Sequence, residues 1–386
     1  TNVRLGTVGA LLQVAALSGQ MDAGLRRWLH AARPQVHFAR VKVAGEQGGR
    51  MSAEGELLQA AFAPVGNAPG LSGLRGRLQG DAEGVQLDLE PAQVMRLDWP
   101  RGFGAPHDVH LAGRIMGWRD EAGGWRVETS AMRVQGTDYA ADLRGGFWFQ
   151  PNGRRPWINL AAKLDDAPMS AGKRFWIHSM MSRGATDWLD MALAGGHVRG
   201  GQGLVVGDLD DWPFDGNDGR FEASARIDRG QIRFQEDWPL MDEVDADIRF
   251  LANGFRIEGR GVLAGVQVQR FDAGIADFHD SLLTVNAASQ GDAAKLVQLL
   301  RQSPLHAAYG STLDNLVARG AATVDFGLRQ PLRQGRGRKE LRGSVQLSDA
   351  RLQDKRWDLQ FDGVNGRAEF TDGGFSAERL AVRHEG

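Results

Sequence analysis

The feature that most constrains this chain is an alternation of apolar and polar residues in short segments that end at glycine, aspartate or asparagine. Residues 220–260 show it most clearly, and their first segment has apolar residues at every second position: Phe221, Ala223, Ala225 and Ile227. An apolar period of two is typical of β-strands in a sheet with one apolar and one polar face. Because the pattern recurs along most of the chain, the central question is what covers the apolar face.

Turn residues separate the predicted strands at intervals of about 8–12 residues, which is typical of an all-β array. The chain has 52 glycines spread along its length, and glycine supplies the positive φ angles that tight turns need. Turns are therefore predicted at Gly48-Gly49, Gly80-Asp81, Gly123-Gly124, Gly145-Gly146, Asn152-Gly153, Arg229-Gly230 and Asn253-Gly254, with a corner at residues 237–239.

Helical segments interrupt the predicted strands. Apolar residues at helical spacing predict helices over residues 8–32, 170–193 and 292–300, and a shorter one near 311–316. Asp292 is expected to cap the third helix, which ends before Pro304. The expected segments are a helical lead-in (1–35), a β-segment (36–165), a helical interruption (166–200), a second β-segment (201–290), another helical interruption (291–320) and a last β-segment (321–386).

Two stretches of the chain share one order of parts, which indicates a repeat. Residues 219–259 and 341–380 each contain an alternating strand, an aspartate-containing turn, a strand near tryptophan, a strand that ends in phenylalanine and a Gly-Phe restart. Repeats of one small β unit along an axis are typical of solenoid-like proteins. We therefore predict a mainly β fold with short helices at segment junctions, in which an elongated, twisted antiparallel sheet curls into an open hydrophobic groove.

Composition argues against several classes of function. The net charge of −2 argues against nucleic-acid binding, and the absence of cysteine excludes disulfides, thiolate metal sites and a cysteine nucleophile. No apolar run reaches the roughly 20 residues that a membrane-spanning helix needs. Because the chain begins at Thr1 and ends within a strand pattern, we expect it to be an internal piece of a longer protein.

No arrangement of residues indicates catalysis, so we predict neither enzyme activity nor a cofactor. His107 and His110 are close in sequence, but a metal site there would need a third ligand from elsewhere. Turn formation explains an acidic stretch that lacks the residue order of an EF-hand, so no metal site is predicted. That stretch contains Asp208, Asp210, Asp211, Asp215, Asn217 and Asp218.

Two further segments have functional alternatives. The basic run at residues 329–342 is interpreted as a solvated hairpin loop, and the alternative is contact with anionic lipid headgroups. The helix expected around residues 173–193 either packs across a sheet end or forms a lid over an apolar trough, where methionine suits acyl chains. Its candidate lid residues are Phe175, Trp176, Met180 and Trp188.

Residues 186–260 resemble the AsmA-like proteins, and most closely their YhdP branch. The order and spacing of several short motifs together carry this resemblance, although each motif is weak alone. The motifs are Asp187-Trp188-Leu189-Asp190, Gly195-Gly196, Gly207-Asp208-Leu209, Asp211-Trp212-Pro213-Phe214, Gly219-Arg220-Phe221 and Asp237-Trp238-Pro239, followed by the strand at 245–250. The strand entry after Pro34, the helix end at residues 303–305 and the C-terminal strands look like the same family.

The resemblance implies a long protein that extends through the periplasm of a Gram-negative bacterium and is anchored in the inner membrane by a segment outside this chain. It implies repeating β-groove segments that move phospholipid to the outer membrane and support the lipid homeostasis of that membrane. The expected partners are phospholipid acyl chains, the inner membrane, and proteins of the periplasm or outer membrane, with no nucleic acid.

The residues expected to line the groove are apolar members of the alternating strands, which would replace water around acyl chains. They are Phe221, Ala223, Ala225, Ile227, Ile232, Phe234, Ala246, Ile248, Phe250, Phe255, Ile257, Val324, Phe326, Leu328, Val345, Leu347, Leu359 and Phe361. Two other functions stay open on the sequence: a structural periplasmic scaffold that binds no lipid, and a carbohydrate-active β-solenoid.

Overall fold

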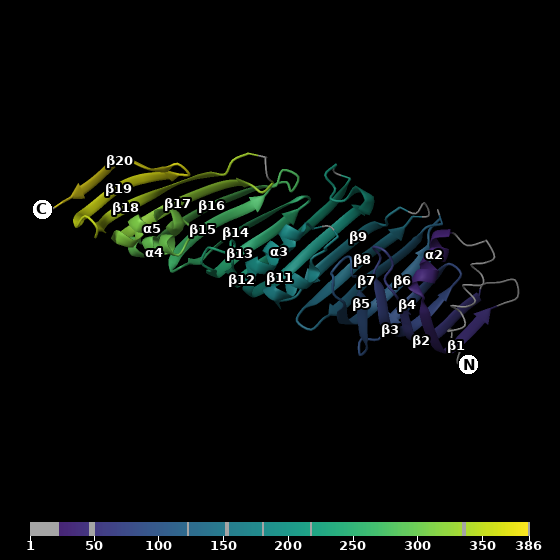
Figure 1. Cartoon of the computed structure of the whole chain (residues 1–386). Coiled ribbons are helices and arrows are strands. Elements are labelled where there is room, and N and C mark those ends of the chain that lie inside the picture. Colours follow the sequence, from purple (N-terminus) through teal and green to yellow (C-terminus); the bar gives the residue numbers. More distant parts are fainter. Residues whose placement is uncertain are drawn as a thin grey trace. The chain divides into compact units, whose positions relative to one another are not determined.

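The computed structural model of the chain describes residues 23–45, 51–121, 123–150, 154–179, 181–216, 218–333 and 337–384. The chain divides into two compact units, which are unit 1 (Thr1–Thr186 and Gly200–Phe221) and unit 2 (Asp187–Arg199 and Glu222–Gly386). Both units consist of antiparallel strands with a few short helices, so the predicted mainly β fold is confirmed (Figure 1).

Unit 1 is a sheet whose strands mostly pair in chain order. Strand β1 pairs with β2, β2 with β3, and the series β6, β7, β8, β9 and β11 continues in the same way. Between β3 and β6 lie two short strands, β4 and β5, each of which pairs with both neighbours. The elements are α2 (Ala23–Ala32), β1 (Gln35–Gly45), β2 (Met51–Phe62), β3 (Gly70–Asp81), β4 (Gly84–Leu89), β5 (Val94–Asp98), β6 (His107–Arg119), β7 (Trp125–Gln135), β8 (Ala140–Phe149), β9 (Trp157–Leu164), β10 (Ala167–Pro168), the 3-10 helix η1 (Met169–Phe175), and the part of β11 (Leu193–Asp208) from residue 200, followed by the 3-10 helix η2 (Leu209–Asp211).

Unit 2 is a second meander in which each strand from β12 to β20 pairs with the next one in the chain. Helices α4 and α5 interrupt the meander between β16 and β17, and Figure 1 shows them beside the strands of this unit. The elements are α3 (Arg183–Ala192), whose first turn belongs to unit 1, then β12 (Gly219–Ile232), β13 (Met241–Leu251), β14 (Gly254–Leu263), β15 (Val266–Ile275), β16 (Leu282–Asp292), α4 (Ala293–Arg301), α5 (Leu305–Asn315), β17 (Leu316–Pro331), β18 (Glu340–Asp354), β19 (Leu359–Thr371) and β20 (Gly374–Arg383).

The strands of unit 2 bend at β-bulges whose extra residue has a positive φ angle. Arg229 in β12 (φ 47°) and Asp349 in β18 (φ 48°) lie where the register of the sheet shifts. A side chain of the neighbouring strand accepts a hydrogen bond from each bulged residue. The N–H of Arg229 donates to Asp245 at 3.4 Å, and the N–H of Asp349 donates to Asn365 at 2.9 Å. Because a bulge kinks its strand and increases the local twist, these positions curl the sheet.

Two of the predicted turns lie inside strands. Arg229-Gly230 lies inside β12 and Gly145-Gly146 lies inside β8, so both turn predictions are wrong. Gly145 has a φ of 114°, and a Cβ atom on it would lie 1.9 Å from the carbonyl oxygen of Asn159. Glycine is needed there because the neighbouring strand approaches closely, not because the chain reverses.

The other described turns are confirmed. The loop at Asn253-Gly254 joins β13 to β14, with Leu251 opposite Gly254. A turn follows Gly80-Asp81, where the Asp81 carboxylate accepts hydrogen bonds from the backbone of Glu83 and Gly84. Turns also lie at Gly123-Gly124 and at the corner of residues 237–239. The turns predicted at Gly48-Gly49 and Asn152-Gly153 lie outside the described residues.

The helical predictions are confirmed in part. Asp292 caps α4, because its carboxylate accepts a hydrogen bond from the backbone N–H of Ala294 at 2.7 Å. Helix α5 begins directly after Pro304 and so is longer than the short helix predicted near 311–316. Of the helix predicted over 8–32, the part before residue 23 lies outside the described residues.

The single helix predicted over residues 170–193 is wrong. Helices η1 and α3 are separate, because the residues between them form backbone hydrogen bonds with another loop of unit 1. The N–H of His178 donates to Gly102 O at 2.9 Å, and the N–H of Ser179 donates to Arg101 O at 3.0 Å. Strand β11 begins at Leu193, inside the range expected to be helical.

We predict that adding a methyl group at Gly320 destabilises unit 2, whereas the same change at Gly291 does not. Gly320 has a φ of 102°, and its Cβ would lie 2.8 Å from the Cα of Ala350, so Gly320→Ala should cost about 2 kcal/mol of the free energy of unfolding. Gly291, in β16, has no atom within 4 Å of the added position. Urea unfolding followed by tryptophan fluorescence measures both, and equal midpoints for the two variants would contradict the close approach at Gly320.

Candidate functional site

The apolar face of unit 2 consists of rows of residues that lie directly opposite one another on successive strands. Residues paired in this way project from the same face of an antiparallel sheet. One row contains Ala225, Ile248, Ile257, Ala273, Val285 and Leu328, and the next contains Ile227, Ala246, Gly259, Phe271, Ala287 and Phe326. The register therefore joins residues far apart in the sequence into one continuous apolar surface.

Most of this surface is only partly buried. Ile227 and Ala246 are buried, at 4% and 3% exposure, whereas Ile248, Phe250 and Phe326 keep an intermediate exposure. Phenylalanines on adjacent strands pack together, and the ring centroids of Phe250 and Phe255 are 5.9 Å apart. Unit 2 thus carries an apolar sheet face that its own strands do not bury.

The structure places the predicted lining residues of the middle strands on this one face. Ala223 lies opposite Phe250, which lies opposite Phe255, and Val324 lies opposite Val345. Ile232 pairs with Met241 beyond the bulge of β12. The pairing that brings these side chains together also adds residues the sequence prediction omitted, which are Ile275, Ala273, Phe271, Val285, Ala287 and Phe370. The alternation of apolar and polar residues in these segments could have identified them from the sequence.

Four predicted lining residues lie at the margins of the sheet. Phe221, in unit 1, packs against Trp212 with ring centroids 5.0 Å apart. Phe234 follows the end of β12 and lies 5.7 Å from Trp238. Leu359 is 39% exposed at the start of β19.

The fourth marginal residue, Phe361, lies opposite Leu352 of β18. Leu352 belongs to the group of side chains that pack under α4. Phe361 thus lies beside the part of the face that α4 covers.

Helix α4 covers one part of the apolar face of unit 2. Its residues Ala293 and Val297 form a buried cluster with Ala318 and Ala322 of β17. The predicted lining residues Val345 and Leu347 pack against that cluster, so they support the helix. The remaining rows of the face lie beyond the helix.

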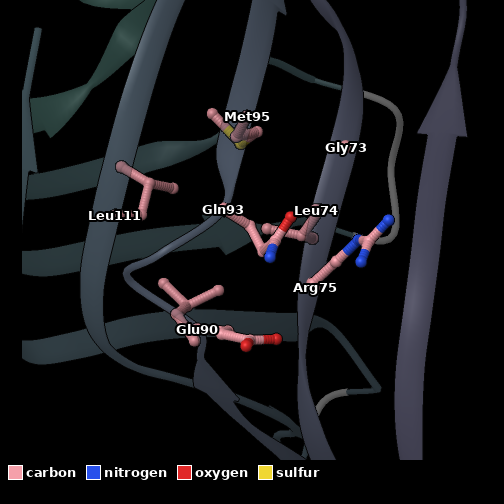
Figure 2. Close-up of a pocket in the computed structure, with 8 residues that line it drawn as sticks. Gly73, Leu74, Arg75, Glu90, Gln93, Met95 and Leu111 are labelled. Atoms are coloured by element: carbon pink, nitrogen blue, oxygen red, sulfur yellow. The ribbon is translucent and has the colours of Figure 1, made fainter.

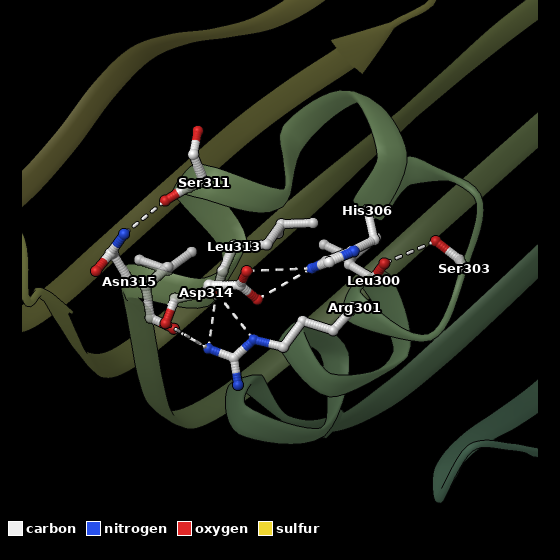
Figure 3. Close-up of polar contacts among 9 residues, drawn as sticks. Leu300, Arg301, Ser303, His306, Ser311, Leu313, Asp314 and Asn315 are labelled. Carbon is white, nitrogen blue, oxygen red and sulfur yellow. Dashed lines mark hydrogen bonds and ion pairs between the residues drawn. The ribbon is translucent and has the colours of Figure 1, made fainter.

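Polar contacts tie α5 to α4 (Figure 3). The Arg301 guanidinium donates to the carbonyl oxygens of Leu313 at 2.7 Å and of Leu316 at 2.9 Å, which satisfies acceptors at the end of α5. His306 lies 3.0 Å from the carboxylate of Asp314. The bonds from Arg301 hold α5 beside α4, whereas the His306–Asp314 contact lies within α5.

The opposite face of unit 2 carries charged pairs that cross from strand to strand. Arg256 contacts Asp272 at 2.5 Å, and Arg260 contacts Asp245 at 3.0 Å. The pKa of Asp245 lies below its usual range because Arg260 and the backbone N–H of Arg229 donate hydrogen bonds to it. The predicted division into an apolar and a polar face therefore appears in the register and in the chemistry of the side chains.

Unit 1 has a smaller apolar cluster on its first strands. Leu57, Leu87 and Leu89 are buried, and Leu74 and Leu111 pack against them. Because these residues come from β2, β3, β4 and β6, the cluster crosses this part of the sheet.

The candidate lid residues do not share one helix. Phe175 ends η1 and packs among aromatic residues of unit 1, 4.8 Å from Tyr139 and 5.3 Å from His107 between ring centroids. Trp176 has extended backbone, Trp188 is on α3, where its indole donates to Phe234 O at 2.9 Å, and Met180 lies outside the described residues. A single lid helix is therefore not formed.

The histidines considered for metal binding are held apart. His107 is buried at 8% exposure among the aromatic rings, whereas His110 is exposed on the other face of β6, 3.0 Å from Pro91 O. Asp208 of the acidic stretch caps η2 by accepting the backbone N–H of Asp210 at 3.0 Å. Across the described residues no three histidine, aspartate or glutamate side chains gather as a metal site would require.

Comparison with known proteins identifies the family. A family model described as YhdP protein matches residues 2–384. The chain belongs to the YhdP family. It is 25% identical over 319 residues to the intermembrane phospholipid transporter YhdP of Escherichia coli (strain K12), and the match covers 81% of this chain and 25% of that protein.

This member of the YhdP family thus spans about a quarter of the length of its curated relative. No solved structure matches the chain. Among the described residues, none of the helices has the length and apolar character needed to cross a bilayer.

We predict that acidification destabilises unit 1 through His107. Burial among aromatic rings lowers the pKa of His107, so its neutral form stabilises the folded state above the unfolded pKa of about 6.5. That contribution is lost as the pH falls from there towards the lower folded pKa. Thermal unfolding from pH 7.5 to pH 5 should show a smaller loss of Tm in His107→Phe than in the wild type or in His110→Gln. Equal losses in all three would contradict this role.

Proposed function

We propose that this chain carries phospholipid along the apolar faces of its sheet units, with acyl chains on the apolar rows and headgroups in solvent. The observation that carries the proposal is the continuous, partly exposed apolar surface from β12 to β17. Each acyl CH₂ that leaves water gains about 0.8 kcal/mol, and no covalent step is needed. The chain would act as a binding and transfer segment and not as an enzyme.

The name of the relative supports the same function at the level of the family. The match to an intermembrane phospholipid transporter agrees with an apolar face of this size, because such a protein must shield acyl chains from water. We further propose that the chain works in the periplasm of a Gram-negative bacterium as part of a protein anchored in the inner membrane. Its transfer of phospholipid towards the outer membrane would support the lipid homeostasis of that membrane.

The effect of a charged substitution on each face of the sheet distinguishes this proposal from a scaffold that binds no lipid. On a scaffold, a charge on the apolar face would matter only through its effect on folding. On a lipid path, it would also expel acyl chains, because an unpaired charge in an apolar environment costs several kcal/mol. Adjacent residues of β17 allow this comparison, since Val324 belongs to the apolar face and Thr323 points to the polar face.

We predict that Val324→Arg removes bound phospholipid and that Thr323→Arg does not. Organic extraction and mass spectrometry of the gently purified chain measure the lipid per protein, and circular dichroism checks the fold. The wild type and Thr323→Arg should retain near-stoichiometric phospholipid, whereas Val324→Arg should lose about tenfold or more. Lipid-free but folded wild-type protein would favour the scaffold.

A further inference from the structure

The hollow between β3 and β6 of unit 1 is too small for a ligand (Figure 2). It lies beside residues 90–93, the loop that separates β4 from β5, and Leu74, Leu111 and Met95 are among the residues that line it. It has room for about one water molecule. A binding surface is found instead in unit 2, at the hairpin that joins β17 to β18.

The basic hairpin, which comprises residues 329–333 and 337–342, carries a cluster of positive charge. Between residues 329 and 342 the sequence has six arginine or lysine residues and one acid, Glu340. The structure describes five of the cations, all of them exposed, and none of the five forms an ion pair with an acid of the described residues. These five are Arg329, Arg333, Arg338, Lys339 and Arg342.

Other cations of unit 2 do pair with acids. The Arg226 guanidinium lies 3.6 Å from the Asp247 carboxylate, and that of Arg260 lies 3.0 Å from Asp245, in each case across neighbouring strands. The whole chain has a net charge of −2, so it has no general attraction for an anionic partner. The basic hairpin is therefore a local positive surface, whose field reaches about 10 Å at 0.1 M salt.

An exposed leucine lies within the basic hairpin. Leu332 directly precedes Arg333 and is 53% exposed. Its backbone N–H donates to the carbonyl oxygen of Ser281 at 2.9 Å, which attaches the hairpin to the loop between β15 and β16. Leu328, four residues earlier, belongs to an apolar row of the sheet. The apolar face thus ends beside a leucine that cations flank in the sequence.

We propose that the basic hairpin docks on the surface of an anionic phospholipid bilayer. Cations spread along a loop suit a surface with many charges, because each of them adds to the attraction, and Leu332 would enter the boundary between headgroups and acyl chains. Docking would bring the end of the apolar face at Leu328 to the bilayer. The proposal goes beyond the proposed function, since it concerns contact with a membrane and not the path along the sheet.

Flotation with vesicles tests the docking. The purified chain is mixed with phosphatidylcholine vesicles that contain or lack phosphatidylglycerol, and the bound fraction is measured at low and at high salt. The wild type should bind the anionic vesicles, and high salt should release it. The affinity of the double variant Arg338→Gln/Lys339→Gln for these vesicles should be lower by about tenfold or more.

A matched control removes one lysine and one arginine elsewhere in unit 2. Lys295 is exposed on α4, and Arg319 is exposed near the start of β17, whereas the basic hairpin follows the end of that strand. Lys295→Gln/Arg319→Gln changes the net charge equally and should keep the affinity of the wild type. Circular dichroism checks that both double variants are folded.

The outcomes separate docking from the lipid path. Binding that does not depend on phosphatidylglycerol, no binding of the wild type, or an equal loss in the two double variants would overturn docking and leave the proposed function standing. Wild-type protein that binds anionic vesicles but carries no lipid after purification would overturn the proposed function alone. Loss of co-purified phospholipid only in Arg338→Gln/Lys339→Gln would show that these cations contact the carried lipid, and would overturn docking.

Discussion

The cross-strand register is the constraint on which the rest of this structure depends. Because side chains alternate with a period of two, a slip of one residue between neighbours would move the apolar residues of a strand to the polar face. The observed register keeps Ile248 opposite Ile257 and Asp247 opposite Glu258, so that one surface stays apolar from strand to strand. Charged pairs such as Arg260 with Asp245 lie on the other face, where water and salt weaken them. The hydrophobic surface is thus a property of the whole sheet and not of any one strand.

Two devices shape this surface without breaking it. Bulges such as that at Arg229 add a residue to one strand and so preserve the face while bending the sheet. Helix α4 buries part of the apolar face through Val297, and Arg301 holds α5 beside it. The surface is therefore covered where α4 packs on β17 and partly exposed over the other strands.

Features that depend on residues close together in the sequence could be predicted, whereas features that depend on contacts between distant segments could not. Local signals were sufficient for the strands, for the hairpin at Asn253-Gly254 and for the cap at Asp292. They failed at Gly145, where glycine is needed because the neighbouring strand approaches closely. A local sequence pattern does not reveal such an approach. The break of the strand at residues 90–93 and the burial of His107 under Phe175 also depend on pairing between distant segments. The predicted lining residues omitted those of β15 and β16, although Phe271, Ala273 and Ile275 alternate in the sequence; the pairing of these strands with β14 and β17 places them on the apolar face.

The most direct test of the account is a photo-cross-linking scan along β13, with a benzophenone side chain at each position from 245 to 250 and phospholipid adducts detected by mass spectrometry. The account predicts adducts at Ile248 and Phe250, which are partly exposed on the apolar face, and none at Asp245, Asp247 and Arg249, which lie on the polar face. No adduct is expected at Ala246, which is buried at 3% exposure. Adducts of equal yield at all six positions, or none at any of them, would contradict a lipid path on this face.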